Sequence, residues 1–196
     1  MDSLVDFPCP ICAVEGDLFM RAHTSEIPYF GEHTQVTLLC NKCGWRQTDF
    51  IPSEGSKAGG WSICVQSEDV LNARVVRSSS CTICIPELDL EVNPGSSNAG
   101  YVTNIEGIIV RFKDVVETIL RDLQSEDDDE ITEKCNHLLS MISAPLGGDF
   151  SEPYNILLLD PRGHSQILHD GAEPRELSEN EIERLPVGPD PATFSA

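Results

Sequence analysis

The sequence predicts an α+β protein that is mainly β and carries one helical hairpin. Two Cys-x-x-Cys pairs stand within the first 43 residues, which is typical of a small module built around a metal ion. Short runs rich in β-branched residues, separated by glycine and proline, occupy much of the remaining chain. One long stretch instead spaces its apolar residues at helical intervals.

These patterns divide the chain of 196 residues, which is long enough for a small metal module and one larger domain. We expect the module at 1–52 and a β-rich domain at 61–170. The helical hairpin is expected as an insertion at about 103–144. The remainder, 171–196, is acidic and bears prolines, so we expect a largely irregular tail.

The two cysteine pairs, Cys9/Cys12 and Cys40/Cys43, predict one bound zinc ion. Two residues between thiols let both sulfurs of a tight turn face the same ion, and Zn²⁺ takes four such ligands in a tetrahedron. Gly44 suits a backbone that turns back toward the metal, because glycine adopts a positive φ at little cost. Two disulfides or four unrelated thiols are the alternatives, but doubled pairs at this spacing favour one structural zinc ion.

Three short runs between and after the pairs predict the small antiparallel sheet of a zinc ribbon, at 18–22, 36–39 and 45–51. Gly31 and Glu32 indicate the turn before the second strand. Such a sheet has little core of its own, so zinc binding would supply much of its folding free energy, on the order of 10–16 kcal/mol. The glycine- and serine-rich stretch at 52–60 predicts a flexible linker.

The β-rich domain opens with four strand-like runs, at 61–65, 74–78, 82–85 and 88–92. Within them, Cys81 and Cys84 repeat the Cys-x-x-Cys spacing. Residues three apart in a strand point to opposite faces, so these two thiols would not converge on one ion. Cys64 and Cys135 are isolated. We therefore expect Cys81 and Cys84 to be structural thiols that are buried or half-buried.

Helical spacing begins at residue 105 and continues to 123, where apolar residues trace one face. The run Thr103-Asn104-Ile105-Glu106 predicts a capping box at its start. A second amphipathic run, 131–142, stops before Pro145, so the two runs predict a helical hairpin. The acidic connection at 125–130 lacks the alternating ligands and central glycine of a calcium loop. We expect a solvated helix cap there.

Strand character returns at 154–159. Asp160-Pro161-Arg162-Gly163 predicts a turn, and 164–168 is expected to be the answering strand of a hairpin. Strands that resume after a helical insertion imply a sheet assembled from distant segments. In the tail, Ser178 and Glu181 predict the cap of a short helix that ends at about Leu185.

The charge balance argues against a nucleic-acid partner. The chain has 33 acidic and 13 basic residues, a net charge of −20, which would repel a phosphate backbone. The same charge could attract a basic partner, or reflect a salty cytoplasm. The many thiols without an evident partner indicate a reducing compartment. The sequence shows no apolar signal peptide or membrane-spanning run, so we expect a cytoplasmic protein with no membrane partner.

Several motifs in a fixed order resemble those of the ZPR-type zinc-finger proteins. They are Cys-Pro-x-Cys at Cys9, the run Ile27-Pro28-Tyr29-Phe30, Cys40-x-x-Cys43-Gly44, Arg74-Val75-Val76-Arg77-Ser78, the run from Ile85 to Glu91, Glu106-Gly107 and Asp160-Pro161-x-Gly163-x-Ser165. The resemblance spans roughly residues 7–170. The eukaryotic members carry the module twice, whereas this chain has one copy and looks like the single-module form found in archaea.

The resemblance implies a zinc ribbon followed by a β-domain of double-stranded β-helix type that carries a helical hairpin. Its eukaryotic members bind translation elongation factor 1-alpha and assist its folding, which implies a zinc-binding protein-interaction module, a chaperone-like adaptor with no enzyme activity. The candidate contact residues are Ile27, Pro28, Tyr29, Phe30 and the outer surface of the hairpin. Alternatively, Tyr29 and Phe30 pack the ribbon onto the β-domain.

Two other functions are weighed against the adaptor. A metal-dependent enzyme on the β-domain would need a cluster of histidines and carboxylates, for which Asp160, His164 and His169 are the nearest candidates. These histidines are more simply explained as exposed turn residues. The third hypothesis is a zinc ribbon that binds nucleic acid, and the net charge argues against it.

Overall fold

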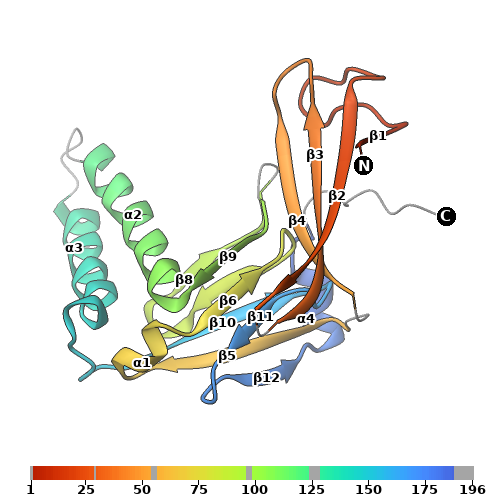
Figure 1. The fold of residues 1–196 in the computed structure, drawn as a ribbon. Helices are drawn as coiled ribbons and strands as arrows, with labels where there is room; N and C mark the ends of the chain where they lie inside the picture. Colours follow the sequence, from red (N-terminus) through yellow and green to blue (C-terminus); the bar gives the residue numbers. More distant parts are fainter. Residues whose placement is uncertain (1, 29, 54–56, 96–98, 124–128, 188–196) are drawn as a thin grey trace.

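The computed structural model describes residues 2–28, 30–53, 57–95, 99–123 and 129–187. The β-domain forms the base of the molecule, and two arms project from it (Figure 1). One arm is the ribbon of the N-terminal strands, and the other is the helical hairpin. The predicted class, mainly β with one helical hairpin, is confirmed.

The ribbon arm is a four-stranded antiparallel sheet in the order β1-β2-β3-β4. Its strands are Asp2–Leu4, Leu18–Ile27, Gly31–Cys40 and Arg46–Pro52. Leu18 pairs with Cys40 at the cysteine end, and Ile27 pairs with Gly31 at the other end. The turn therefore precedes Gly31, whose φ of 77° is left-handed, and Glu32 already belongs to β3.

The β-domain consists of two antiparallel sheets with strand orders β12-β5-β10-β7-β8 and β11-β6-β9. The five-stranded sheet contains Glu173–Glu176, Gly59–Val65, Tyr154–Asp160, Thr82–Ile85 and Leu90–Val92. The three-stranded sheet contains Gln166–Leu168, Arg74–Arg77 and Tyr101–Asn104. Strand β10 alternates strictly between buried and half-buried residues, because one of its faces lies on the core.

The predicted hairpin of 154–159 with 164–168 is wrong. Strand β11 pairs with β6 of the other sheet and not with β10. The cause lies at Asp160, the buried last residue of β10, whose carboxylate accepts hydrogen bonds from the hydroxyls of Ser78, Ser80 and Ser165 at 2.6–2.7 Å. These bonds hold the start of the β11 segment beside the end of β6, so the chain crosses between the sheets.

The tail is more ordered than predicted. Strand β12 lies at the edge of the five-stranded sheet beside β5, so the sheet extends beyond the expected boundary at 170. The short helix α4, Glu179–Arg184, follows it with the predicted capping box of Ser178 and Glu181. A short helix that the sequence pattern did not predict, α1 at Glu68–Leu71, precedes β6. Residues 188–196 lie outside the described residues.

The second arm is formed by α2, Ile105–Leu123, and α3, Asp129–Ser143, which pack against each other. The N-cap of α2 differs from the prediction, because the Asn104 side-chain oxygen accepts the Gly107 N–H at 2.9 Å. As expected, α3 ends just before Pro145, which begins a 3₁₀ turn. Residues 125–128 of the acidic cap predicted at 125–130 lie outside the described residues; Asp129 and Glu130 occupy the first turn of α3.

One large hydrophobic core joins both sheets to the helical hairpin. It contains Ile156 and Leu158 from β10, Ile108 and Phe112 from α2, and Cys135 from α3. The ribbon has a smaller cluster of its own around Leu18 and Leu38, next to the cysteines. The predicted dependence of the ribbon on metal follows from this small core.

A buried hydrogen-bond network joins the ribbon to the β-domain. Asp49 of β4, which is 2% exposed, accepts bonds from the backbone N–H and the hydroxyl of Ser79 at 2.8 and 2.7 Å. The Gly100 N–H donates to the carbonyl of Thr48 at 2.6 Å. The ribbon is therefore anchored through the middle of β4, and its cysteine end points away from the β-domain (Figure 1).

Candidate metal centre

The four predicted cysteines come together at the free end of the ribbon arm. Cys9 and Cys12 lie in the connection between β1 and β2, Cys40 is the last residue of β3, and Cys43 lies in the turn before β4. Their Sγ atoms lie within 4.8 Å of one another. In the described part of the chain, this is the one group of three or more histidine, cysteine or acidic side chains close enough to share an ion.

The two cysteine turns have the same backbone geometry. The carbonyl of Cys9 accepts the Ala13 N–H at 2.8 Å, and the carbonyl of Cys40 accepts the Gly44 N–H at 2.9 Å. Ala13 and Gly44 both have left-handed φ, 54° and 76° respectively. The conformation expected of Gly44 is present, and the first turn imposes it on an alanine, for which it is unfavourable.

The sulfur positions fit a zinc ion and exclude disulfides. Four ligands about 2.3 Å from one ion at the corners of a tetrahedron lie about 3.8 Å apart. The Sγ distances are 3.7 Å between Cys9 and Cys43 and 3.7 Å between Cys12 and Cys40. A disulfide requires about 2.05 Å. All eight cysteines are free thiols, and these four are arranged as the ligands of one structural zinc ion.

The thiol pKa values show why a cation is needed here. Burial raises the pKa of Cys9, but the backbone N–H groups of Cys12 and Ile11 and the thiols of Cys40 and Cys12 lower it to about 7. At Cys43 the backbone N–H of Trp45 lowers the pKa, whereas burial and the three other thiols raise it to about 12. The Cys9 thiol can ionise near neutral pH, whereas the Cys43 thiol needs a positive ion beside it in order to ionise.

The second Cys-x-x-Cys pair belongs to the core, as predicted. Cys81 and Cys84 are both buried. Burial is the main cause that raises the pKa of each thiol, to about 12. Neither thiol belongs to a group of three or more ligand side chains in the described part of the chain, so the pair is not arranged to hold a metal ion.

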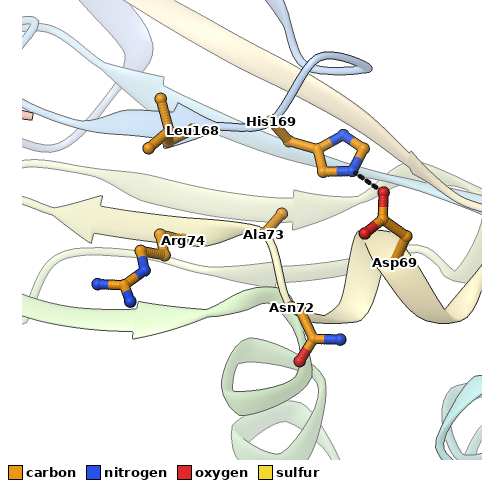
Figure 2. Close-up of a pocket in the computed structure, with 6 residues that line it drawn as sticks. All are labelled: Asp69, Asn72, Ala73, Arg74, Leu168 and His169. Atoms are coloured by element: carbon orange, nitrogen blue, oxygen red, sulfur yellow. Dashed lines mark hydrogen bonds and ion pairs between the residues drawn. The ribbon is translucent and has the colours of Figure 1, made fainter. Parts of the chain in front are cut away.

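The residues of the enzyme alternative do not form a metal site among the described residues. His169 lies in the loop after β11, and its Nε2 is 3.0 Å from a carboxylate oxygen of Asp69 on α1, at the edge of a cavity of about 220 Å³ (Figure 2). The carboxylate of Asp160 is taken up by serine hydroxyls. His164 is half-buried, and burial lowers its pKa, although Asp160 and Asp49 act in the opposite direction.

The predicted contact run at the ribbon turn is only partly exposed. Phe30 is buried at 9% exposure, which agrees with a packing role. Pro28 is exposed and Ile27 is half-buried. Tyr29 lies outside the described residues. A role of this run in partner binding stays a prediction.

Two sets of exposed apolar side chains were not predicted as residues, although the outer surface of the hairpin was expected to be a contact surface. Leu4, Phe7 and Ile11 lie at or next to the cysteine end of the ribbon and are 51%, 36% and 54% exposed. Val115 and Ile119 lie one turn apart on α2 and are 51% and 46% exposed. The apolar stripe of α2 is broader than the face that the helix buries against the core. The width of that stripe in the sequence is the signal that could have revealed Val115 and Ile119 as exposed.

No helix in the described part of the chain is long and apolar enough to cross a membrane.

Comparison with known proteins places these features in one family. The family model of the ZPR1 jelly-roll domain matches residues 69–186. A ZPR1-like protein of Methanocaldococcus jannaschii is 35% identical over 188 residues, which cover 96% of this chain and 92% of that protein. A ZPR1-like protein of Pyrococcus horikoshii is 35% identical over 182 residues, which cover 92% of this chain and 80% of that protein.

A more distant match is the zinc finger chaperone zpr1 of Schizosaccharomyces pombe, which is 30% identical over 166 residues. The matched part covers 81% of this chain and 34% of the yeast protein. The chain thus corresponds to about a third of the eukaryotic relative and to most of each archaeal one.

Proposed function

The chain belongs to the ZPR1 family, and we propose that it is a chaperone-like adaptor that binds the counterpart of translation elongation factor 1-alpha. The coarser part of this function, a zinc-binding module of the ZPR1 type, follows from the four-thiol site and the family. The client is proposed on the resemblance to the eukaryotic members. The name of the yeast relative, a chaperone, supports the same class of function.

The observation that carries the proposal is the closed metal site at the tip of a projecting arm. Four cysteine ligands leave no coordination position for water or substrate, so the zinc is a poor catalyst and a good scaffold. Three exposed apolar side chains, Leu4, Phe7 and Ile11, lie at this end. A rigid apolar tip of this kind suits a protein contact.

The α2 strip, Val115 and Ile119, supplies a second contact surface on the other arm. The net charge of −20 would speed the approach of a client that is basic over its contact surface. We place this activity in the cytoplasm and assign no catalytic role to the chain.

The test uses the purified elongation factor 1-alpha of the same cell and the zinc-loaded chain, with the dissociation constant measured by calorimetry. We expect Ile11→Ser and the pair Val115→Ser with Ile119→Ser each to weaken binding about tenfold or more, because contacts at an interface centre contribute above 1 kcal/mol. Val187→Ser is the matched control, since Val187 is 39% exposed and lies on neither surface.

Three outcomes decide the proposal. If the unchanged chain does not bind elongation factor 1-alpha, the proposed client is wrong. Unchanged binding by both sets of variants overturns the two surfaces. A loss caused equally by Val187→Ser shows that the effect is not specific to them.

A further inference from the structure

A buried arginine borders a cavity under α2. Arg77, the last residue of β6, is 1% exposed and is the largest of the fully buried side chains. Its Nη2 donates to the carbonyl of Cys81 at 2.6 Å. Its Nε and Nη1 have no hydrogen-bond partner within the described part of the chain. Buried guanidinium groups ordinarily satisfy their donors, so the missing partner needs an explanation.

A second guanidinium lies beside the same aromatic ring. Arg77 pairs with Tyr101 across β6 and β9, and its Cζ is 5.5 Å from the centre of the Tyr101 ring. The Cζ of Arg111 on α2 is 4.3 Å from that centre. Among the described residues, no carboxylate forms a salt bridge with either arginine. Two cations therefore share one ring in a chain that is otherwise strongly acidic.

The cavity has a volume of about 190 Å³ and is lined by these three residues and by apolar side chains. Its lining comes from β6 and β9 of one sheet, from β7 and β8 of the other and from α2. The apolar part of its lining is Ile83, Val92, Ile108, Phe112 and Val115. Apolar cavities of about 150 Å³ can hold a ring of six carbons, so the space is sufficient for a small organic group.

We propose that this cavity binds a carboxylate carried on an apolar stem. The fork of an arginine matches the two oxygens of a carboxylate, and the free Nε and Nη1 of Arg77 are the donors that such a group would satisfy. Arg111 supplies the second positive charge, and the apolar lining accepts the stem. The proposal is independent of the zinc site, and its cavity shares only Val115 with the surface proposed for the client. The carboxylate is either that of a free small acid or the C-terminus of a peptide.

The first test titrates the zinc-loaded chain with 3-phenylpropanoate and, as a neutral match, with 3-phenylpropanamide, followed by NMR. We expect the acid to bind with a dissociation constant on the order of 1 mM, as suits a fragment of its size, and to shift the Nε–H signal of Arg77. The amide should bind at least tenfold more weakly. Arg111→Gln should weaken binding of the acid about tenfold, whereas Arg121→Gln, an exposed arginine further along α2, should not.

A second arm distinguishes the two sources of the carboxylate. A tetrapeptide that ends in phenylalanine with a free carboxylate is compared with its C-terminal amide. Tighter binding of the free peptide than of 3-phenylpropanoate assigns the site to chain ends, and the reverse order assigns it to free acids. Equal binding of acids and amides, or an Arg77 signal that neither acid moves, overturns the proposal and leaves Arg77 as a packing residue.

Discussion

Individual residues show how the cysteine turns prepare the metal site. The zinc ligands could be predicted because their spacing is local and each turn encodes its own geometry. The strained backbone at Ala13 could not be predicted. Its left-handed φ arises because the two cysteine turns have the same geometry, and an alanine in the sequence does not indicate a left-handed φ. Arg77 was also missed, because an arginine at the end of a strand is normally expected to face solvent.

The left-handed φ in each cysteine turn predicts that Gly44→Ala lowers zinc affinity and that Ala13→Gly raises it. A Cβ at Gly44 would meet nothing within 4 Å, so Gly44→Ala adds only the cost of left-handed φ, about 1–2 kcal/mol. Competition with a chelator should show zinc affinity reduced roughly five- to thirtyfold. Ala13→Gly should make zinc binding more favourable by about 0.5–1 kcal/mol. The gain is smaller than the full cost of left-handed φ, because glycine also increases the conformational entropy of the unfolded chain.

Gly147→Ala provides the control for both variants. A Cβ there also meets nothing within 4 Å, φ is not left-handed, and the residue lies far from the metal site. Its zinc affinity should equal that of the unchanged chain. An Ala13→Gly chain that binds zinc no better, together with a neutral Gly44→Ala, would contradict the geometry of the two turns.

At the level of elements, the sequence pattern predicted most strands and helices, but it did not predict which strand β11 pairs with. The runs that became β2, β3, β4, β5, β10, α2 and α3 were each evident from period and turn residues. The partner of β11 was not, because its choice depends on the buried carboxylate of Asp160 and on hydroxyls of residues up to 82 positions away. Contacts at that separation leave no local pattern in a single sequence.

Asp160 gives the fold a defined dependence on pH. Burial acts to raise its pKa, but hydrogen bonds from Ser165, Ser80 and Ser78 and from the Arg162 N–H lower it overall. A carboxylate whose folded pKa is depressed contributes stability above its unfolded pKa of about 3.9, and that stability is lost as the pH falls through the folded pKa. Stability should therefore decline below about pH 4.

Asp160→Asn isolates this contribution. The variant should be less stable at pH 7 by about 2–3 kcal/mol, because hydrogen bonds to a charged group are lost, and the difference should shrink below pH 4. Denaturant unfolding followed by tryptophan fluorescence measures both. Asp114→Asn, an exposed change on α2, should leave the stability at pH 7 unchanged. A difference between Asp160→Asn and the unchanged chain that is constant from pH 3 to pH 7 would contradict the role given to this carboxylate.

The whole molecule presents two arms on one base, and this arrangement gives the zinc its role. The ribbon is attached through the middle of β4, where Asp49 binds Ser79, so its cysteine end is held away from the β-domain. The order of the modules was predictable from the sequence. Their attachment was not, because Asp49 and the serines of 78–80 carry no signal of their own as a buried contact.

The adaptor role depends on a zinc ion whose four coordination positions are all occupied by cysteine sulfurs. X-ray absorption at the zinc edge of the purified, zinc-loaded chain tests this most directly. We expect four sulfur neighbours at about 2.3 Å and no oxygen or nitrogen neighbour. Three sulfurs with one oxygen or nitrogen would show an open position on the zinc and contradict a purely structural role for the ion.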